Sequence, residues 1–197
     1  MPSRTNSRAV SNARNEVLET LKEDHKRVKK AYRDFTKLDV EEDPERCEAL
    51  VRQVLADLQV HATLEEELLY PAARDAINEP DLIDEAEVEH ESAKALIAQL
   101  NSMDVDDDKF AARFTVLCEY VMHHVKEEEG ELFQQLQSAR LDWETIAREM
   151  RERRAELLPA ESEALLAEGE SEAGAQMKRQ GRSTNGRSEG ASGGRGD

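Results

Sequence analysis

A short pattern of histidine and glutamate occurs twice in this sequence, and it constrains the fold more than any other feature. The segments His61–Glu65 and His124–Glu128 each hold a histidine and, four residues later, a glutamate. One more histidine precedes each segment, His25 thirty-six residues before the first and His90 thirty-four residues before the second. Four of the five histidines therefore belong to a repeat, which predicts one helical pair present in two copies.

Length and charge exclude several classes of protein. The 197 residues suffice for one domain and its tails, and 36% of them are charged, with a net charge of -17. Such a surface repels the phosphates of nucleic acids and of anionic membranes, so we expect neither as a partner. No apolar run approaches the roughly 20 residues of a membrane span, and the polar start lacks the apolar stretch of a secretion signal. The sequence therefore predicts a cytoplasmic protein.

Apolar periodicity divides the chain into four parts. Residues 1–13 are polar and lack periodicity, so we predict a disordered N-terminal tail. Residues 14–140 contain four stretches with apolar side chains at helical spacing, the predicted bundle. Residues 141–158 predict a short accessory helix that begins after Asp142, a favourable N-cap. Residues 159–197 form a predicted flexible tail, because they are rich in glycine and poor in large apolar residues.

Each of the four predicted helices carries one of the repeated histidines on its apolar stripe. His25, for example, lies four residues after one leucine and three residues before a valine of the first stripe. The second helix is predicted to begin at Asp43 and Pro44, an N-cap followed by proline at the first helical position, and Pro71 should kink or fray its end. Strand patterns are absent. The sequence predicts an all-α fold, an antiparallel up-down four-helix bundle.

The inward histidines and glutamates predict a metal site in the bundle core. Residues four apart on a helix differ by about 40° in direction, so both groups of each His-x-x-x-Glu pattern face one point. Burying Glu65 and Glu128 without cations costs several kcal/mol, and no Lys or Arg lies on the inner stripes. Two divalent cations would neutralise both carboxylates. Mixed nitrogen and oxygen ligands with open positions favour iron over manganese or zinc.

A simpler interpretation exists for each residue alone. A single inward histidine is more often a hydrogen-bonded core residue than a ligand, but a repeated set of four with two glutamates favours the metal site. His123, next to His124, lies about 100° round the helix and is assigned to the surface. The other acids of the runs Glu65–Glu67 and Glu127–Glu131 are expected to be solvated.

Four blocks of the sequence resemble the hemerythrin-like HHE cation-binding family over roughly residues 14–140. The blocks are "EDHKRVK", "VHATLEEELLYPA", "EVEHESAK" and "HHVKEEEGELF". The resemblance implies a four-helix bundle around two non-haem iron ions that share an oxo or hydroxo bridge. It also implies four terminal histidine ligands and two bridging carboxylates. In this sequence these are His25, His61, His90, His124, Glu65 and Glu128.

The sequence departs from the oxygen-carrying hemerythrins at two positions. Ala86 stands where those proteins have a further ligand histidine, one turn before His90. Glu87 is a candidate replacement, since a Glu-x-x-His pair can hold a metal from one helix, and an exposed acid is the alternative. The acid of the fourth helix, Glu128, is a glutamate one place earlier than the carriers' aspartate. Both departures argue against reversible oxygen transport and favour a more open site.

Two further residues are candidate hydrogen-bond partners of ligand histidines. Asp57 precedes His61 by four residues, and Tyr120 precedes His124 by four, so each lies one turn from a ligand on the same face. Packing at the rim of the site is the alternative role for both.

Two functions remain open at this stage. The first is a di-iron protein that acts on or senses dioxygen, peroxide or nitric oxide, with peroxide or oxygen reduction as its candidate enzymatic activity. The alternative is a non-catalytic iron-handling protein or an interaction module whose metal stabilises the fold. The expected partner is a small diatomic ligand or peroxide, and protein partners are not indicated by the sequence.

Overall fold

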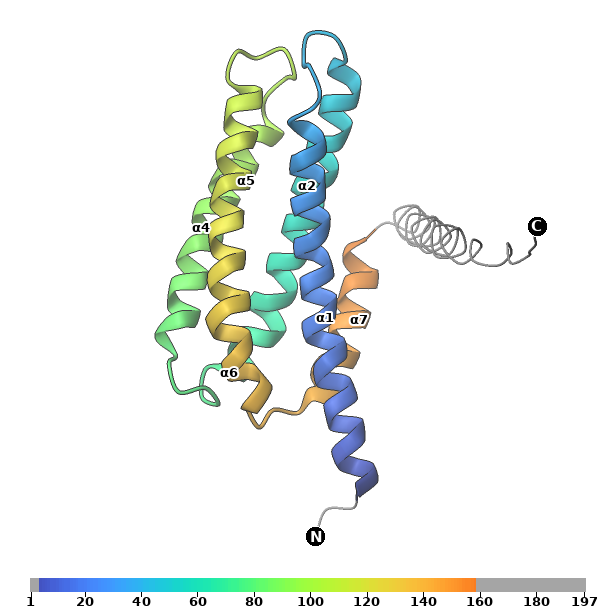
Figure 1. Cartoon of the computed structure of the whole chain (residues 1–197), viewed down its shortest axis with the longest axis vertical. Coiled ribbons are helices and arrows are strands. Elements are labelled where there is room, and N and C mark those ends of the chain that lie inside the picture. Colours follow the sequence, from blue (N-terminus) through green and yellow to red (C-terminus); the bar gives the residue numbers. More distant parts are fainter. Residues whose placement is uncertain (1–3, 159–197) are drawn as a thin grey trace, which may run out of the picture. The chain divides into compact units, whose positions relative to one another are not determined.

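The computed structural model describes residues 4–158, and every regular element within this range is a helix (Figure 1). The elements are α1 (Arg4–Phe35), α2 (Pro44–Leu64), η1 (Glu65–Leu69), α3 (Tyr70–Ala73), α4 (Asp81–Asn101), α5 (Phe110–Glu127), η2 (Glu128–Leu132), α6 (Phe133–Ser138) and α7 (Trp143–Leu157). Both η segments are π-helical turns. The all-α prediction is confirmed.

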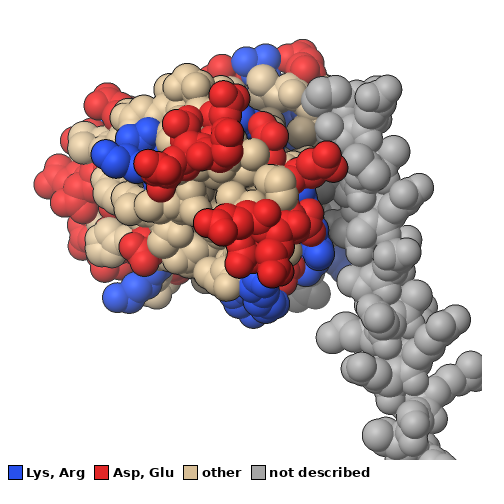
Figure 2. All heavy atoms as spheres, turned by 90° about the horizontal axis from the view of Figure 1, so that it is seen from above, with Lys and Arg blue, Asp and Glu red and all other residues tan. Residues whose placement is uncertain are grey.

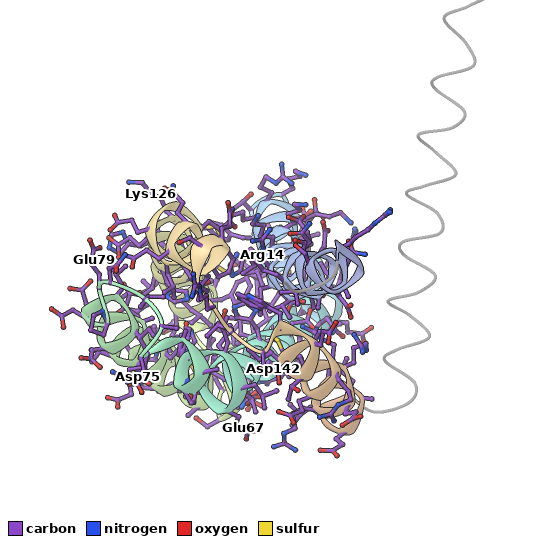
Figure 3. The ribbon with its side chains drawn as sticks, turned by 90° about the horizontal axis from the view of Figure 1, so that it is seen from below. Arg14, Glu67, Asp75, Glu79, Lys126 and Asp142 are labelled. Atoms are coloured by element: carbon purple, nitrogen blue, oxygen red, sulfur yellow. The ribbon has the colours of Figure 1, made fainter. Side chains whose placement is uncertain are left out.

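Four antiparallel rods form the bundle. They are α1, the continuous α2–η1–α3, α4, and the continuous α5–η2–α6. Seen along the bundle, the rods follow one another round a ring in the order α1, α2, α4, α5, and α7 lies outside this ring against α1 and α2 (Figure 3). None of the helices in residues 4–158 is both long and apolar enough to cross a bilayer.

The start of the first helix differs from the prediction. Helix α1 begins at Arg4, so the expected disorder of residues 1–13 is wrong for residues 4–13. Ala13 is buried, and the guanidinium of Arg14 donates a hydrogen bond to the carbonyl of Gln137 at 2.5 Å. The contact with the end of α6 is thus made at Arg14, directly after this segment. Residues 1–3 and the predicted tail at 159–197 lie outside the described residues.

The second and fourth rods contain the same irregularity at the same place. The predicted cap is present, since the Asp43 side chain accepts from the amide of Arg46 and Pro44 opens α2. Pro71 lies in α3, which directly follows a π-turn, and the rod ends two residues later at Ala73. In the other half, η2 is followed by Gln134 of α6 at the position that matches Pro71, so a π-turn forms there without proline. π-turns inside α-helices often accompany functional sites.

Helix α7 begins where the sequence places it. The Asp142 carboxylate accepts hydrogen bonds from the amide of Thr145 at 3.2 Å and from its hydroxyl at 2.9 Å. Trp143, Ile146 and Met150 are buried, which seats α7 against the bundle. The larger apolar core fills the end of the bundle that carries the α1–α2 and α4–α5 loops. There Phe114 packs edge-on against Phe35, with 4.6 Å between the ring centroids. The histidines therefore lie between this core and the π-turns.

Candidate metal centre

The six ligand candidates predicted from the sequence come together in the middle of the bundle. All of them are at most 5% exposed, and each of the four rods contributes. They are His25 from α1, His61 from α2, Glu65 from η1, His90 from α4, His124 from α5 and Glu128 from η2. The two glutamates are the first residues of the two π-turns, so the irregular backbone starts at the carboxylates.

The first group of donors joins α1 and α2. The Nε2 atoms of His25 and His61 lie 3.2 Å apart. The Nε2 of His61 is 3.1 Å from Oε2 of Glu65, and the Nε2 of His25 is 3.3 Å from Oε2 of Glu128. These four side chains offer ligand atoms that all lie within 4.8 Å of one another, which is a suitable cluster for one cation.

The second group joins α4 and α5 in the same way. The Nε2 atoms of His90 and His124 again lie 3.2 Å apart, and Oε2 of Glu65 is 3.5 Å from the Nε2 of His90. Glu65 therefore belongs to both groups. Glu128 reaches the Nε2 of His124 at 3.8 Å. The two carboxylates lie between the two histidine pairs, the position of bridging ligands.

A carboxylate holds the other ring nitrogen, Nδ1, of every one of these histidines. Asp24 bonds to His61 at 3.2 Å, Glu66 to His90 at 2.9 Å, Glu89 to His124 at 2.7 Å and Glu129 to His25 at 2.8 Å. A carboxylate only accepts hydrogen bonds, so Nδ1 carries the proton and each Nε2 is left to face the centre. Partners of this kind orient metal-binding imidazoles and raise their basicity.

The donor geometry fits a cation between each pair of histidines. If each ring is neutral, its Nε2 presents a lone pair, and two facing lone pairs at 3.2 Å cannot form a hydrogen bond. Two nitrogens that bind one metal at about 2.1 Å lie roughly 3.0–3.4 Å apart. The buried oxygens Glu65 Oε1 and Glu128 Oε2 also have no hydrogen-bond partner among the described residues. Unsatisfied buried carboxylate oxygens are costly, and a cation would satisfy them.

Protonation of the metal-free protein differs between the two groups. Burial, together with the neighbouring Glu128, raises the pKa of Glu65 to about 7. Burial opposes protonation of His61, but Glu65 and Asp24 outweigh it and raise its pKa well above the ordinary value. Burial, followed by repulsion from His124, lowers the pKa of His90 to about 4. Protons therefore substitute for a cation mainly in the first group.

An aromatic side chain closes each group on the side of the π-turns. Phe133 stacks on His25, with ring centroids 6.0 Å apart and planes 12° apart. At the matching position of the repeat, Tyr70 lies over His90 at 5.7 Å. Its hydroxyl is 3.3 Å from Oε2 of Glu65 and 3.4 Å from Oε1 of Glu128, and its side chain is fully buried. One phenol thus contacts both central carboxylates, and only from one half of the bundle.

A narrow cavity adjoins the histidines on the side of the α1–α2 and α4–α5 loops. Its volume is about 30 Å³, and apolar side chains from all four rods line it above the imidazoles. They include Val28, Leu58, Ile97 and Val121. A cavity of this size holds one water molecule or a ligand of similar dimensions.

Comparison with known proteins places the chain in a family. Residues 16–136 match the hemerythrin HHE cation binding domain. The chain belongs to this family. A crystal structure of a hemerythrin HHE cation binding domain-containing protein from Mycobacterium kansasii has a similar fold, with a TM-score of 0.57 and 23% identity. The similarity covers 70% of this chain and 86% of that one.

One relative of this HHE domain is a longer protein. A protein from Nostoc sp. (strain PCC 7120 / SAG 25.82 / UTEX 2576) named DNA nickase is 32% identical over 117 residues. The matched region covers 59% of this chain and 32% of that protein, so the chain spans about a third of the relative's length.

Three further candidates from the sequence lie elsewhere in this HHE domain. Glu87 does not join the donors, because it pairs with Arg74 at 2.9 Å and is 43% exposed, which agrees with the alternative of an exposed acid. Asp57 and Tyr120 both line the cavity. Asp57 accepts from the amide of Gln53 at 2.9 Å, and neither side chain bonds to a histidine among the described residues.

The residues that do bond to the histidines were missed in the sequence. Asp24 and Glu89 directly precede candidate ligand histidines, while Glu66 and Glu129 directly follow the two central glutamates. The expectation that Glu66 and Glu129 are only solvated charge is therefore wrong. The repeat contained a signal, because all four acids occur at equivalent positions in the two halves. Each acid serves a histidine on the next rod, which periodicity within one helix cannot indicate.

Proposed function

We propose that this HHE domain is a non-haem di-iron protein that acts on or senses dioxygen, peroxide or nitric oxide. The observation that carries the proposal is the pair of three- and four-donor groups that share Glu65. Their donors are imidazole nitrogens and carboxylate oxygens, which suit iron and exceed what one structural zinc requires. Manganese and zinc are the less favoured occupants.

The residues of the chain would divide the work of such a centre. His25, His61, His90 and His124 would be terminal ligands, and Glu65 and Glu128 the bridges, with a solvent-derived bridge completing the pair. A bound pair of iron ions supplies redox chemistry and free positions for a small ligand. The second group, with three protein donors against four in the first, has more room for that ligand.

The cavity above the imidazoles supports a very small ligand. A volume of about 30 Å³ accepts a diatomic molecule or peroxide and excludes organic substrates. Its apolar walls limit the water that reaches the site, which protects a reactive ligand. The absence of a histidine at Ala86, buried on α4, removes one imidazole that the oxygen carriers use and argues against plain oxygen transport.

An alternative function is iron handling or metal-dependent stabilisation without turnover. The ring of four carboxylates around the histidines would serve this function equally well, because it favours metal binding whatever the ligand. A chain of this kind would bind iron and respond to ligands without consuming them.

The name of the Nostoc relative suggests DNA as that protein's substrate. We propose that this chain does not bind DNA. Seen from the loop end, acidic side chains gather on the surface and basic ones are fewer (Figure 2). With a net charge of -17, duplex binding would require a basic face that the sequence does not provide. Fluorescence anisotropy with a labelled duplex at low salt should give no binding.

Metal content and the absorption spectrum test the proposal. The protein is expressed with iron, purified without chelators, and measured before and after peroxide. About two irons per chain and a peroxide-sensitive near-ultraviolet band are expected from a ferric pair. Both should be lost in the Glu65→Ala, Glu128→Ala double variant and retained in Glu131→Ala, an exposed acid outside the groups. Tightly bound zinc without a spectral response would refute the redox function. A ligand response without peroxide consumption would favour the alternative.

A further inference from the structure

A second histidine–glutamate pair lies beside the inner one on α5 and faces outward. His123 and Glu127 are four residues apart, and the Nε2 of His123 is 3.1 Å from Oε1 of Glu127. Both side chains are exposed, at 59% and 44%. The equivalent positions in the other half of the repeat are Val60 and Leu64, both buried. The outward pair therefore belongs to one half only, and the inner site does not use it.

Glu89, on the neighbouring helix α4, completes an outer group of three donors. Glu89, His123 and Glu127 each offer a ligand atom within 4.8 Å of the other two. Glu89 also touches the inner site, because its Oε2 accepts a hydrogen bond from Nδ1 of His124 at 2.7 Å. Among the ion pairs of residues 4–158, Glu89 has no lysine or arginine partner. One carboxylate thus separates the outer group from an inner ligand.

The same acids line a route from the surface toward the inner site. A shallow groove of about 460 Å³ is lined by Glu85, Glu89, Glu127 and their neighbours on α4. Behind it, a cavity of about 20 Å³ shares these three acids and reaches Glu128 and His124. None of the described residues that line the groove or the cavity is a lysine or an arginine. Walls of one charge raise the local concentration of the opposite ion.

A buried atom at the inner end of the cavity also points to a cation. Glu128 lines the cavity, is 3% exposed, and its Oε2 has no hydrogen-bond partner among the described residues. A buried carboxylate oxygen of this kind requires a cation or a proton donor. Two residues of the outer group, Glu89 and Glu127, line both the groove and the cavity, and the cavity ends at Glu128 of the candidate metal centre.

We propose that Glu89, His123 and Glu127 form a third site for a divalent cation, through which metal reaches the inner centre. The loading role rests on the proposed di-iron function, whereas the outer site itself does not. With one imidazole, two carboxylates and water at the remaining positions, the outer site binds Fe²⁺ or Mn²⁺ weakly and exchanges it quickly. Glu89 contacts both sites and lies where an ion passes from one to the other.

A manganese titration tests the outer site. The full chain is saturated with iron, freed of excess metal, and titrated with Mn²⁺ while the electron paramagnetic resonance signal of the free ion is recorded. We expect about one further Mn²⁺ per chain, lost in His123→Ala and in Glu127→Gln. The matched control Glu131→Gln removes an exposed acid from the same rod and should retain it. Equal binding by all four proteins would overturn the proposal.

Loading kinetics test the route. With Fe²⁺ below saturation, uptake by His123→Ala and Glu127→Gln should be roughly tenfold slower than in the wild type, with the same final iron content. Added salt should slow the wild type and affect the variants less. Unchanged uptake rates would refute the loading role even if manganese binds. A chain that took up no iron in the saturation step, but whose variants lost one Mn²⁺ relative to the wild type, would refute the proposed function alone.

Discussion

The two halves of this bundle carry the same repeated histidines and glutamate in different surroundings. In the half formed by α1 and α2, Asp24 supports a ligand histidine and is itself held by Arg154 of α7 and by Arg27. In the half formed by α4 and α5, the equivalent Glu89 has no such cations among the described residues and borders an acidic groove. Figure 3 shows α7 beside the first half only.

This difference teaches that a duplicated sequence need not give a duplicated function. The covered half keeps its carboxylate in a fixed, neutralised network, which favours permanent retention of a metal. The uncovered half presents a carboxylate that has no Lys or Arg partner among the described residues, and three donors in place of four. The phenol of Tyr70, from the α2–η1–α3 rod, lies over its His90. We therefore expect the α1–α2 side of the centre to retain its metal ion and the α4–α5 side to exchange it.

The largest expected effect is a difference in metal content between variants of the two central glutamates. Glu65 belongs to both donor groups and Glu128 chiefly to the first. We expect Glu65→Ala to lower the metal content from about two per chain to below one, because the second group then keeps no carboxylate and the first loses one of its two. Glu128→Ala should leave about one metal, held by the second group. Metal analysis after gel filtration measures both, and circular dichroism checks the fold. Equal losses would show that the halves are not distinguishable at the bridges.

Removing the carboxylates behind the histidines should have the next largest effect. Asp24→Asn and Glu89→Gln are each expected to weaken metal binding by roughly 10–100-fold, since both orient an imidazole. Only Asp24→Asn should also destabilise the metal-free protein, by about 2 kcal/mol, because Arg154 then loses a charged acceptor. Chelator competition and urea unfolding separate the two effects. Equal destabilisation by both variants would contradict the proposed difference between the halves.

Metal affinity should depend on pH through the first half. Binding requires the Glu65 carboxylate and a neutral His61, and both have raised pKa values in the metal-free protein, about 7 for Glu65. Below pH 7 the metal must displace a proton from each protonated group. The metal affinity should therefore fall roughly tenfold per pH unit for each proton displaced. It should level off once the pH exceeds the pKa values of both Glu65 and His61. His90, with a pKa of about 4, should contribute nothing between pH 5 and 7. Calorimetry in buffers of different ionisation enthalpy counts the protons released, and no release at pH 6 would contradict this assignment.

The smallest expected effect concerns the phenol. Tyr70→Phe removes the hydroxyl near both central carboxylates and should lower the stability of the metal-free protein by about 1 kcal/mol, a few degrees in Tm. Tyr120→Phe is the matched control, because that hydroxyl has no hydrogen bond among the described residues. Differential scanning calorimetry should find its Tm nearly unchanged. A larger change for Tyr120→Phe would reverse the assigned importance of the two phenols.

The sequence predicted the parts of this molecule that depend on spacing within one helix. The bundle, the caps at Asp43 and Asp142, and the convergence of the six ligand candidates all follow from helical periodicity. The π-turns at Glu65 and Glu128 did not, because the same residues fit a regular helix equally well. The carboxylate partners and the link through Arg154 join different rods, and helical periodicity contains no information about neighbours across a bundle.

The four carboxylate–histidine bonds have a direction. Asp24 on α1 supports α2, Glu66 on η1 supports α4, Glu89 on α4 supports α5, and Glu129 on η2 supports α1 again. Each rod is thus positioned by the one before it, and the last positions the first. A slip of any single rod along the bundle axis would break two of these bonds, the one it provides and the one it receives. The closed circuit fixes the mutual register of the four rods, independently of the loops that connect them.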